Sequence, residues 1–517
     1  MDSEELLKQY AEGERNFTGI ILCEANFSRA NLNQVNFSQA VLNLTNFSDA
    51  NLSEANLSGA KLNVARLTGI NLAHAKLNGT TLNVTNLIQA NLTYAELIEA
   101  KLIRAELIRA DLSHANLKGS NLREADLREA ILIQANLQLV DLTSARLRGS
   151  SLANANLERA NLHRVNLSKA DLQGVNFSNT ELRQAKLSLS NLSKANLKGA
   201  NLRWADLTGA NLSGANLDSA ILTGANLYGA NLQNANLSNA VLVHADLTQT
   251  NLINVSWEGC DLTAATLTGS KLYGVSRFSI TAQDITCNWA DMSANGDGSK
   301  IINFTPENSH KFFNASQPIV KIIVDLPLNP DTHVALAAIY RQIYKQNNLF
   351  ILPPNIEVNS QRTILSFRVE KDQELLATAY VMIYPFKEST LIQNYFLDLV
   401  ENIDQDYSRN LDVRTSNRFA KIRVSINKFK RMINELRTID SQNKLLNLNF
   451  FNSPTQIITI NSLGQEFHIK NSLNSANNNS SDLVIETDEK EYDLFGYFRE
   501  NNLPQNSLIN FVKNFTE

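Results

Sequence analysis

The chain has 517 residues and a formal net charge of −4, so it is long enough for at least two folded domains and close to neutral for its size. It contains no run of eighteen apolar residues, which excludes a hydrophobic membrane-spanning segment. Its three cysteines, Cys23, Cys260 and Cys287, are odd in number and widely spaced, which argues against a disulfide framework and suits a reducing cytosol. The sequence therefore predicts a cytoplasmic protein with at least two domains.

Residues 1–15 predict a short capping helix rather than a secretory signal. They contain neither a basic segment nor the apolar stretch that a signal needs. Asp2 or Ser3 can cap the helix, and Leu6, Leu7 and Tyr10 fall on one face of it. An open stack of strands exposes its apolar core, so we expect this helix to cover the start of the segment that follows.

From Phe17 to Leu272 a large apolar residue returns at every fifth position without an insertion or deletion. Of these 52 positions, Leu occupies 46, Phe occupies five and Trp257 occupies one. A period of five fits neither an α-helix nor a regular strand. It indicates a chain that turns a corner after each pentad, with the apolar residue and the small residue two places before it pointing inward. Four pentads then close one square coil.

This stretch resembles the pentapeptide-repeat family over about half of the chain. The resemblance implies a right-handed quadrilateral β-helix, an all-β solenoid of about 13 coils over residues 16–292. Burial of one Leu contributes about 1.5–3 kcal/mol, whereas ordering five residues costs about 7 kcal/mol, so no coil is stable alone. Stability has to come from the stacking of each coil on its neighbours.

Two patterns concern the corners of the coils. Asn or Asp precedes 33 of the 52 centres, which predicts turn formation by short side chains that bond to the nearby backbone. Of the 15 glycines between Gly19 and Gly274, eleven occupy positions ending in 9 and four occupy positions ending in 4. We therefore expect two alternating corner types, one of which needs a positive φ.

The outward positions of the rod are where a binding surface has to be sought. Ile88 with Ile108, and Ile221 with Val241, are twenty residues apart and so lie on the same face of neighbouring coils. Either these β-branched residues simply suit a strand surface, or they form a contact patch for a partner.

Charged residues of both signs are interspersed along the rod. Between Glu14 and Val275 there are 22 Lys and Arg against 20 Asp and Glu. Some pentapeptide-repeat proteins resemble B-DNA in shape and charge and bind type II topoisomerases, but such a mimic should be strongly acidic.

The twenty-residue spacing predicts two ion pairs across coils, Arg104 with Glu124 and Arg109 with Glu129. The histidines do not fall on adjacent coils, so they predict no metal site: His74, His114, His163 and His244.

The composition changes after Met292, where the repeat ends. All nine prolines lie after residue 300. We expect residues 293–316 to form a linker; its NGDGS sequence could suggest a calcium loop, but the other acidic ligands are missing. Residues 317–517 predict a separate α+β domain of no recognised family. Its expected strands are 319–326, 363–370, 375–384, 456–460 and 466–469, with helices starting at Asn329 and over 391–403.

Residues 409–437 carry the sharpest signal in this domain, with nine Lys or Arg against two acids. Apolar residues at 3-4 spacing predict an amphipathic helix whose stripe packs on its own domain: Phe419, Ile422, Ile426, Phe429, Ile433 and Leu436. Its basic face could contact nucleic acid, an acidic partner, a membrane surface or the acidic segment 482–493 of this chain. The candidate contact residues are Lys421, Arg423, Lys428 and Lys430.

The sequence predicts no catalytic site, cofactor or metal ion, because its histidines stand apart and it has neither a phosphate loop nor a GxSxG turn. We favour a non-enzymatic protein–protein interaction scaffold, in which the rod is a spacer or docking surface and the C-terminal domain recognises a protein partner. The alternative is a nucleic-acid-directed regulator, acting through the basic helix 409–437 or by topoisomerase binding of the rod. Binding to phosphates would weaken steeply with salt, whereas packed protein contacts would change less.

Overall fold

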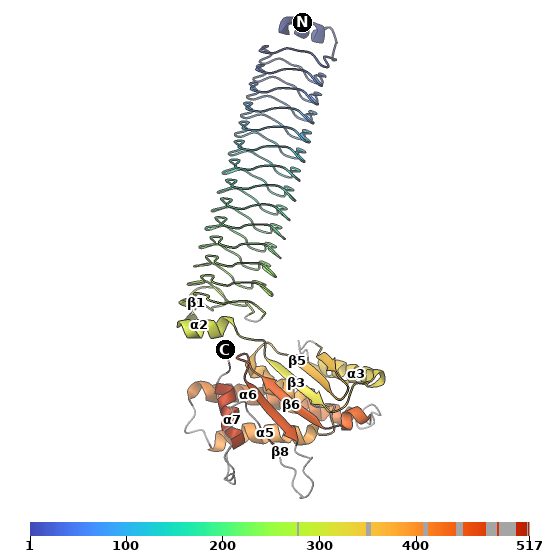
Figure 1. Cartoon of the computed structure of the whole chain (residues 1–517), viewed down its shortest axis with the longest axis vertical. Coiled ribbons are helices and arrows are strands. Elements are labelled where there is room, and N and C mark those ends of the chain that lie inside the picture. Colours follow the sequence, from blue (N-terminus) through green and yellow to red (C-terminus); the bar gives the residue numbers. More distant parts are fainter. Residues whose placement is uncertain are drawn as a thin grey trace. The chain divides into compact units, whose positions relative to one another are not determined.

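The computed structural model describes residues 1–276, 279–347, 353–406, 412–440, 448–471, 483–484, 503–513 and 515. The chain divides into two compact units, Met1–Asn314 and Ala315–Glu517. The first contains a long β-helix and the second contains a sheet with helices (Figure 1). No helix in the described residues is long and apolar enough to cross a membrane.

The β-helix is built from parallel bridges between residues twenty positions apart, from Asn16 with Asn36 to Lys271 with Asp291. Each coil therefore contains four pentads, as the period of five predicts. The fifth-position residues and the small residues two places before them form one continuous buried core. The backbone joins the coils: the Leu92 N–H donates to the Asp111 carbonyl at 2.7 Å, and the Asp111 N–H donates to the Ala90 carbonyl at 2.9 Å.

Every corner of the β-helix uses the same turn, so the prediction of two alternating corner types is wrong. Residues at positions ending in 4 and in 9 both have φ values of roughly +54 to +76°, whether or not they are glycine. The N–H of the following small residue donates to the carbonyl of the central residue, as Ala110 does to Leu107 at 3.0 Å. A positive φ at the third turn residue is the pattern of a type II turn. The uneven glycine distribution thus reflects side chains rather than backbone geometry.

Helix α1 (Ser3–Ala11) lies at the N-terminal end of the β-helix. The Asp2 carboxylate accepts a hydrogen bond from the Glu5 N–H at 2.9 Å and so caps the helix. Leu6 is fully buried in the core of the β-helix. The Tyr10 hydroxyl donates to the Asn33 carbonyl at 2.8 Å, which ties α1 to the first coil.

The segment 293–316 is not a free linker, because most of it folds onto the end of the β-helix. Strand β1 (Trp289–Asp291) pairs antiparallel with β2 (Ile301–Asn303), and helix α2 (Pro306–Phe313) follows. Phe313 is fully buried in the β-helix core, and its ring meets those of Phe304 and Phe312. The last coil would otherwise expose apolar side chains, so these aromatic rings replace the coil that is missing.

The second unit is an antiparallel sheet of six strands in the order β4-β5-β3-β6-β7-β8. The strands are β3 (Ile319–Val324), β4 (Asn355–Val358), β5 (Thr363–Arg368), β6 (Thr455–Ile460), β7 (Glu466–Asn471) and β8 (Leu483–Val484). The helices are α3 (Pro330–Asn347), α4 (Leu375–Met382), α5 (Ser389–Asp406), α6 (Val413–Asp440) and α7 (Leu503–Lys513), with short 3₁₀ turns η1 (Asp372–Glu374) and η3 (Asn449–Asn452). The α+β character of this region agrees with the prediction.

Residues 375–384 were expected to form a strand, but the structure contains helix α4 there. All eight residues of α4 are buried, and the helix lies between strands β3 and β6 on one side and helices α5 and α6 on the other. A helix that is buried all round loses the polar face that gives a helical period. A short apolar run of this kind cannot be told from a buried strand by its pattern.

Within the described part of the chain, helices cover one face of the sheet, and the opposite face stays outside the core that they form. The covered face contributes Val320, Ile322 and Val324 of β3 to the core that the helices form. Alternate residues point to the opposite face. There Ile319, Ile323, Ile364, Ile458 and Ile460 are only half-buried, and none of them belongs to that core. We call this second side the open sheet face.

Candidate functional site

Outward side chains of the β-helix stand in columns, because residues twenty apart share one backbone position on successive coils. The two predicted ion pairs across coils are confirmed: Arg104 Nε lies 2.7 Å from Glu124 Oε2, and Arg109 Nε lies 2.7 Å from Glu129 Oε2. All four side chains are largely exposed, so each pair contributes only a few tenths of a kcal/mol. These pairs show that a column, rather than a neighbour in sequence, determines which side chains meet.

The asparagines before the centres do form turns, and they also bond to one another across coils. The Asn51 Oδ1 accepts from the Ser53 N–H at 3.1 Å, which is the expected local bond. Its Nδ2 donates to Asn31 Oδ1 at 2.9 Å, and Asn71 Nδ2 donates in turn to Asn51 Oδ1 at 3.0 Å. The turn prediction is therefore confirmed, but the ladder across coils was missed. The regular Asn at twenty-residue spacing could have indicated it.

One charged cluster lines a hollow of about 310 Å³ on the β-helix. Asp126 is buried and accepts three hydrogen bonds from the Arg128 guanidinium, at 2.8, 3.0 and 2.7 Å, and its Oδ2 lies 3.6 Å from Arg146. Burial alone would raise the pKa of Asp126, but the hydrogen bonds and charge of Arg128, with the charge of Arg146, outweigh it and lower that pKa. The carboxylate is thus already paired, which makes the cluster a structural network rather than a binding site.

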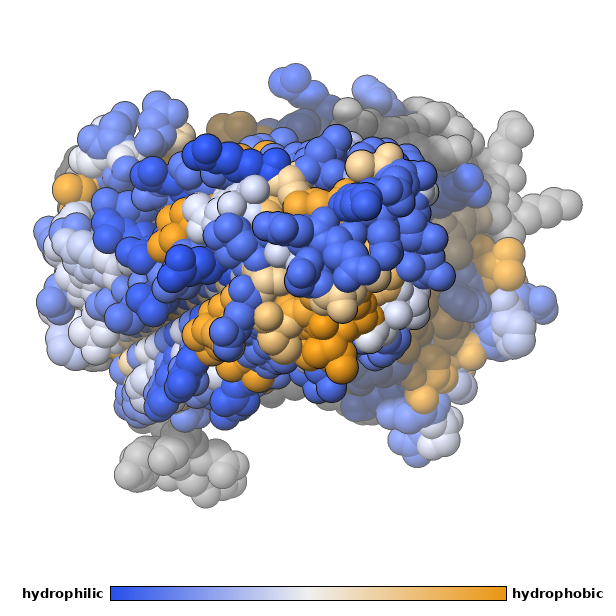
Figure 2. Space-filling view, turned by 90° about the horizontal axis from the view of Figure 1, so that it is seen from above, coloured by the Kyte–Doolittle hydropathy of each residue, from blue (hydrophilic) through white to orange (hydrophobic). Residues whose placement is uncertain are grey.

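The two predicted isoleucine pairs lie on the β-helix surface, but they are not its most exposed apolar residues. Ile88, Ile108, Ile221 and Val241 are all half-buried. Larger exposed fractions occur at the corners, which the sequence interpretation missed: Leu44 51 %, Val64 50 %, Val84 54 %, Leu139 54 %, Leu189 60 % and Trp204 62 %. Apolar residues also gather on one side of the β-helix end that faces the viewer in Figure 2. In the sequence, these exposed corner residues could have been found as large residues at positions ending in 4 or 9, where glycine recurs.

Two of the rod histidines take part in an aromatic stack that the sequence interpretation missed. The ring of Tyr94 lies between those of His74 and His114, with centroid distances of 5.0 and 4.6 Å and nearly parallel planes. The stack runs along the rod, so the two imidazole rings cover both faces of the Tyr94 ring. The Tyr94 ring therefore offers no free face to a ligand.

The amphipathic helix predicted over 409–437 is present as α6. Its apolar stripe is buried in the core of the second unit, as expected: Phe419, Ile422, Ile426, Phe429 and Ile433. Of the four candidate contact residues, Lys421, Lys428 and Lys430 are exposed and Arg423 is half-buried. Most of the acidic segment 482–493 lies outside the described residues. Contact of this basic face with a partner thus stays a prediction.

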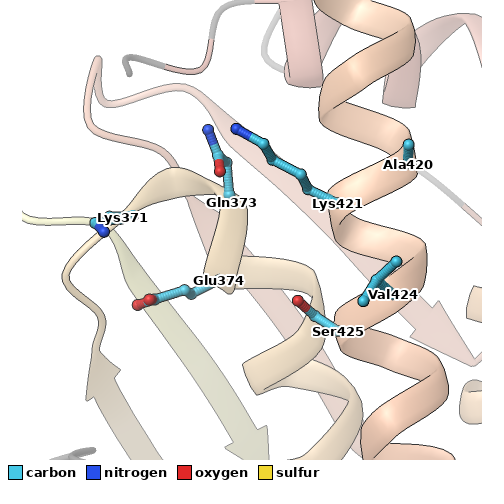
Figure 3. A pocket seen from close by; sticks show the side chains of 7 residues that line it. All are labelled: Lys371, Gln373, Glu374, Ala420, Lys421, Val424 and Ser425. Carbon is cyan, nitrogen blue, oxygen red and sulfur yellow. The ribbon is translucent and has the colours of Figure 1, made fainter.

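A groove of about 470 Å³ runs between η1 and α6, and seven residues line it (Figure 3). Gln373 and Lys421 extend toward the same end of the groove, whereas the Glu374 carboxylate turns away from α6. Burial and then the negative charge of Glu370 raise the pKa of Glu374. The lining groups do not converge on one point, so the groove lacks the geometry of a catalytic centre.

The NGDGS loop satisfies its own carboxylates. Asp291 accepts from the Ser293 N–H and the Gly298 N–H, both at 2.9 Å, and Asp297 accepts from the Ser299 N–H at 3.0 Å. Hydrogen bonds from the Ser299 hydroxyl and N–H, and from the Ser293 hydroxyl, lower the pKa of Asp297 to about 2. Within the described part of the chain, no group of three or more His, Cys, Asp or Glu side chains could hold a metal ion.

Comparisons with known proteins concern the β-helix. The family model "Pentapeptide repeats" matches in several copies between residues 105 and 276, and the model "Pentapeptide repeat region" matches residues 15–87. No curated protein matches the chain, and no family model matches the second unit.

Three similar solved structures are pentapeptide repeat proteins. HetL of the cyanobacterium Nostoc sp. strain PCC 7120, involved in heterocyst differentiation regulation, is 36 % identical over 48 % of this chain and 96 % of its own, with a TM-score of 0.25. A second Nostoc protein is 31 % identical over 19 % of this chain and 84 % of its own, with a TM-score of 0.17. A thylakoid-lumen protein of Arabidopsis thaliana is 30 % identical over 19 % and 69 %, with a TM-score of 0.13. By its family-model matches and its identity to HetL, this chain belongs to the pentapeptide-repeat family and contains the family's right-handed β-helix.

Proposed function

We propose that the chain is a non-enzymatic scaffold for protein–protein interaction. Residues 1–15 cap a β-helix of about 13 coils over residues 16–292, which acts as a rigid docking surface or spacer. Residues 317–517 form an α+β domain that recognises a protein partner. The three free cysteines suit a cytosolic location, which is part of the proposal.

The open sheet face carries the recognition part of this proposal. Its five half-buried isoleucines lie on three hydrogen-bonded strands in two groups, Ile319 with Ile458 and Ile460, and Ile323 with Ile364, and Lys321 lies between the groups on β3. Apolar groups outside the core that are bordered by polar residues are typical of a surface that a partner covers. The β-helix supports the docking part, because its inward residues set the fold and its outward residues can differ from coil to coil.

The experiment uses the full chain as bait in the native cell extract, at low and moderate salt. Ile458→Glu puts a charge on the open sheet face, and Val334→Glu is the matched control on α3, where the side chain is 72 % exposed. We expect proteins captured at both salt concentrations to be lost with Ile458→Glu and kept with Val334→Glu. Equal capture by both variants would contradict recognition through this face. Recovery of nucleic acid at low salt alone would favour the alternative regulator.

A further inference from the structure

One corner column of the β-helix keeps large side chains where the backbone favours glycine. This column holds every twentieth residue from Glu24 to Ala264, and we call it the Trp204 corner. All corner residues have a positive φ, a conformation that strains every residue except glycine. Of the 15 corner glycines, 14 lie in the other three columns and only Gly224 lies in this one. The backbone conformation alone does not explain why this column has side chains where the other columns have glycines.

Trp204 is the most unusual residue of this corner. Its φ is +58° and 62 % of the residue is exposed, so it is strained and leaves a large apolar surface in water. Its ring lies over Gly224 on the next coil, where an added Cβ would come within 2.3 Å of ring carbons. The one glycine of the column thus makes room for the indole. An exposed Trp in a prepared position is the residue type that most often dominates binding interfaces.

The cations near this indole lie on its own coil and on the coils before it. Eleven of the twelve arginines between residues 16 and 275 lie on the two faces that meet at the Trp204 corner. Farther toward the N-terminus several of them are paired with acids, as Arg104 is with Glu124, and Arg183 near Trp204 is paired with Glu181 at 2.7 Å. Near Trp204, the structure gives Arg164, Lys186 and Arg203 no ion pair with any described residue, and all three are exposed. Arginine near an aromatic anchor is the second feature of an interaction hot spot.

We propose that the Trp204 corner binds an acidic segment of a protein partner. A hydrophobic side chain of that segment packs on Trp204, and its carboxylates pair with Arg164, Lys186 and Arg203. Nucleic acid fits less well, because the Gly224 backbone covers one side of the indole and leaves a single ring face for base stacking. The inference rests on the proposed scaffold role and names the chemistry of one partner.

The test selects 15-residue peptides from a random displayed library on the full chain. Trp204→Gly removes the anchor and suits the positive φ, Arg203→Glu reverses one charge, and Leu139→Gly is the matched control at another corner with 54 % exposure. We expect peptides rich in Asp, Glu and large apolar residues. Their affinity should fall at least tenfold with Trp204→Gly and with Arg203→Glu, and stay unchanged with Leu139→Gly.

Three outcomes would overturn the inference: no selected peptides, peptides without acidic enrichment, or equal binding to Trp204→Gly. Tighter binding of a 15-nucleotide DNA strand than of the selected peptides would also overturn it. The extract experiment with Ile458→Glu does not involve Trp204. If the peptide selection fails but the full chain still captures partners, the Trp204 corner is not a binding site, and the scaffold role still stands.

Discussion

The corner backbone predicts that one chemical change has opposite effects at two neighbouring turn positions. Ala264 occupies the third turn residue with a φ of +55°, whereas Ala73 occupies the second turn residue, where φ is negative. Both are half-buried. We expect Ala264→Gly to stabilise its coil and Ala73→Gly to destabilise its coil.

The magnitudes follow from two terms. A residue with a Cβ loses about 1–2 kcal/mol in the left-handed region, and glycine loses about 0.5–1 kcal/mol in chain entropy on folding. Ala264→Gly relieves the first term and adds the second, for a net gain of about 0.5–1 kcal/mol. Ala73→Gly adds only the second, for a loss of similar size. Gly79→Ala should also cost about 1 kcal/mol, because φ is +65° and no atom lies within 4 Å of an added Cβ.

Native-state hydrogen exchange is the suitable assay, because two separate units make one global unfolding free energy ill-defined. Amides of the coil around Ala264 should exchange about two- to five-fold more slowly in Ala264→Gly, and those around Ala73 should exchange faster by the same factor in Ala73→Gly. If both substitutions change exchange in the same direction, the sign of φ does not control corner stability. The account of the turn would then be wrong.

Three further predictions concern buried polar groups. The Ser270 hydroxyl is buried without a hydrogen-bond partner in the described structure, so Ser270→Ala should raise the stability of its coil by about 1 kcal/mol. Ser150→Ala loses a 2.7 Å hydrogen bond and should lower the stability of its coil, and hydrogen exchange of the surrounding amides checks both changes. The lowered pKa of Asp126 means that its contribution is present above about pH 4 and is lost as pH falls through the lower folded-state pKa, so the difference in exchange protection between the wild type and Asp126→Asn should vanish in acid. Asp372 accepts from the Ser462 N–H at 2.7 Å and hydroxyl at 2.6 Å, so Asp372→Asn should destabilise the second unit by about 2 kcal/mol, seen as faster exchange in β6 and β7.

The period of five was sufficient to predict the β-helix, because each pentad repeats the same inward pair. The corners were not predictable in the same way. Glycine marks a positive φ only where it occurs, and 39 residues other than glycine adopt one in the described part of the chain. The β-helix enforces this conformation through its bonds between coils, which outweigh the local preference of residues such as Val64 and Val84. The number of glycines in a corner column therefore depends on side-chain crowding between coils and does not identify the type of turn.

The second unit shows where single-sequence patterns fail. The amphipathic stripe of α6 was recognised because one face is polar and the other is apolar. Helix α5 was also predicted; Ile392, Phe396 and Val400 of it are buried, whereas Leu391, one residue before Ile392, is 38 % exposed. An error of one residue rotates a helical stripe by about 100°. Helix α4 has no stripe at all, so only its packing between the sheet and α6 defines it.

The β-helix separates the residues that make the fold from those that can make a surface. Inward residues repeat almost without change, so they carry little information about function. Outward residues become informative when they oppose the local preference, either by placing a side chain at a positive φ or by exposing an apolar group. Trp204 does both, and Gly224 accommodates it on the next coil. The sequence contains both residues twenty positions apart, but their relation becomes visible only when the coil length and the sign of φ are known.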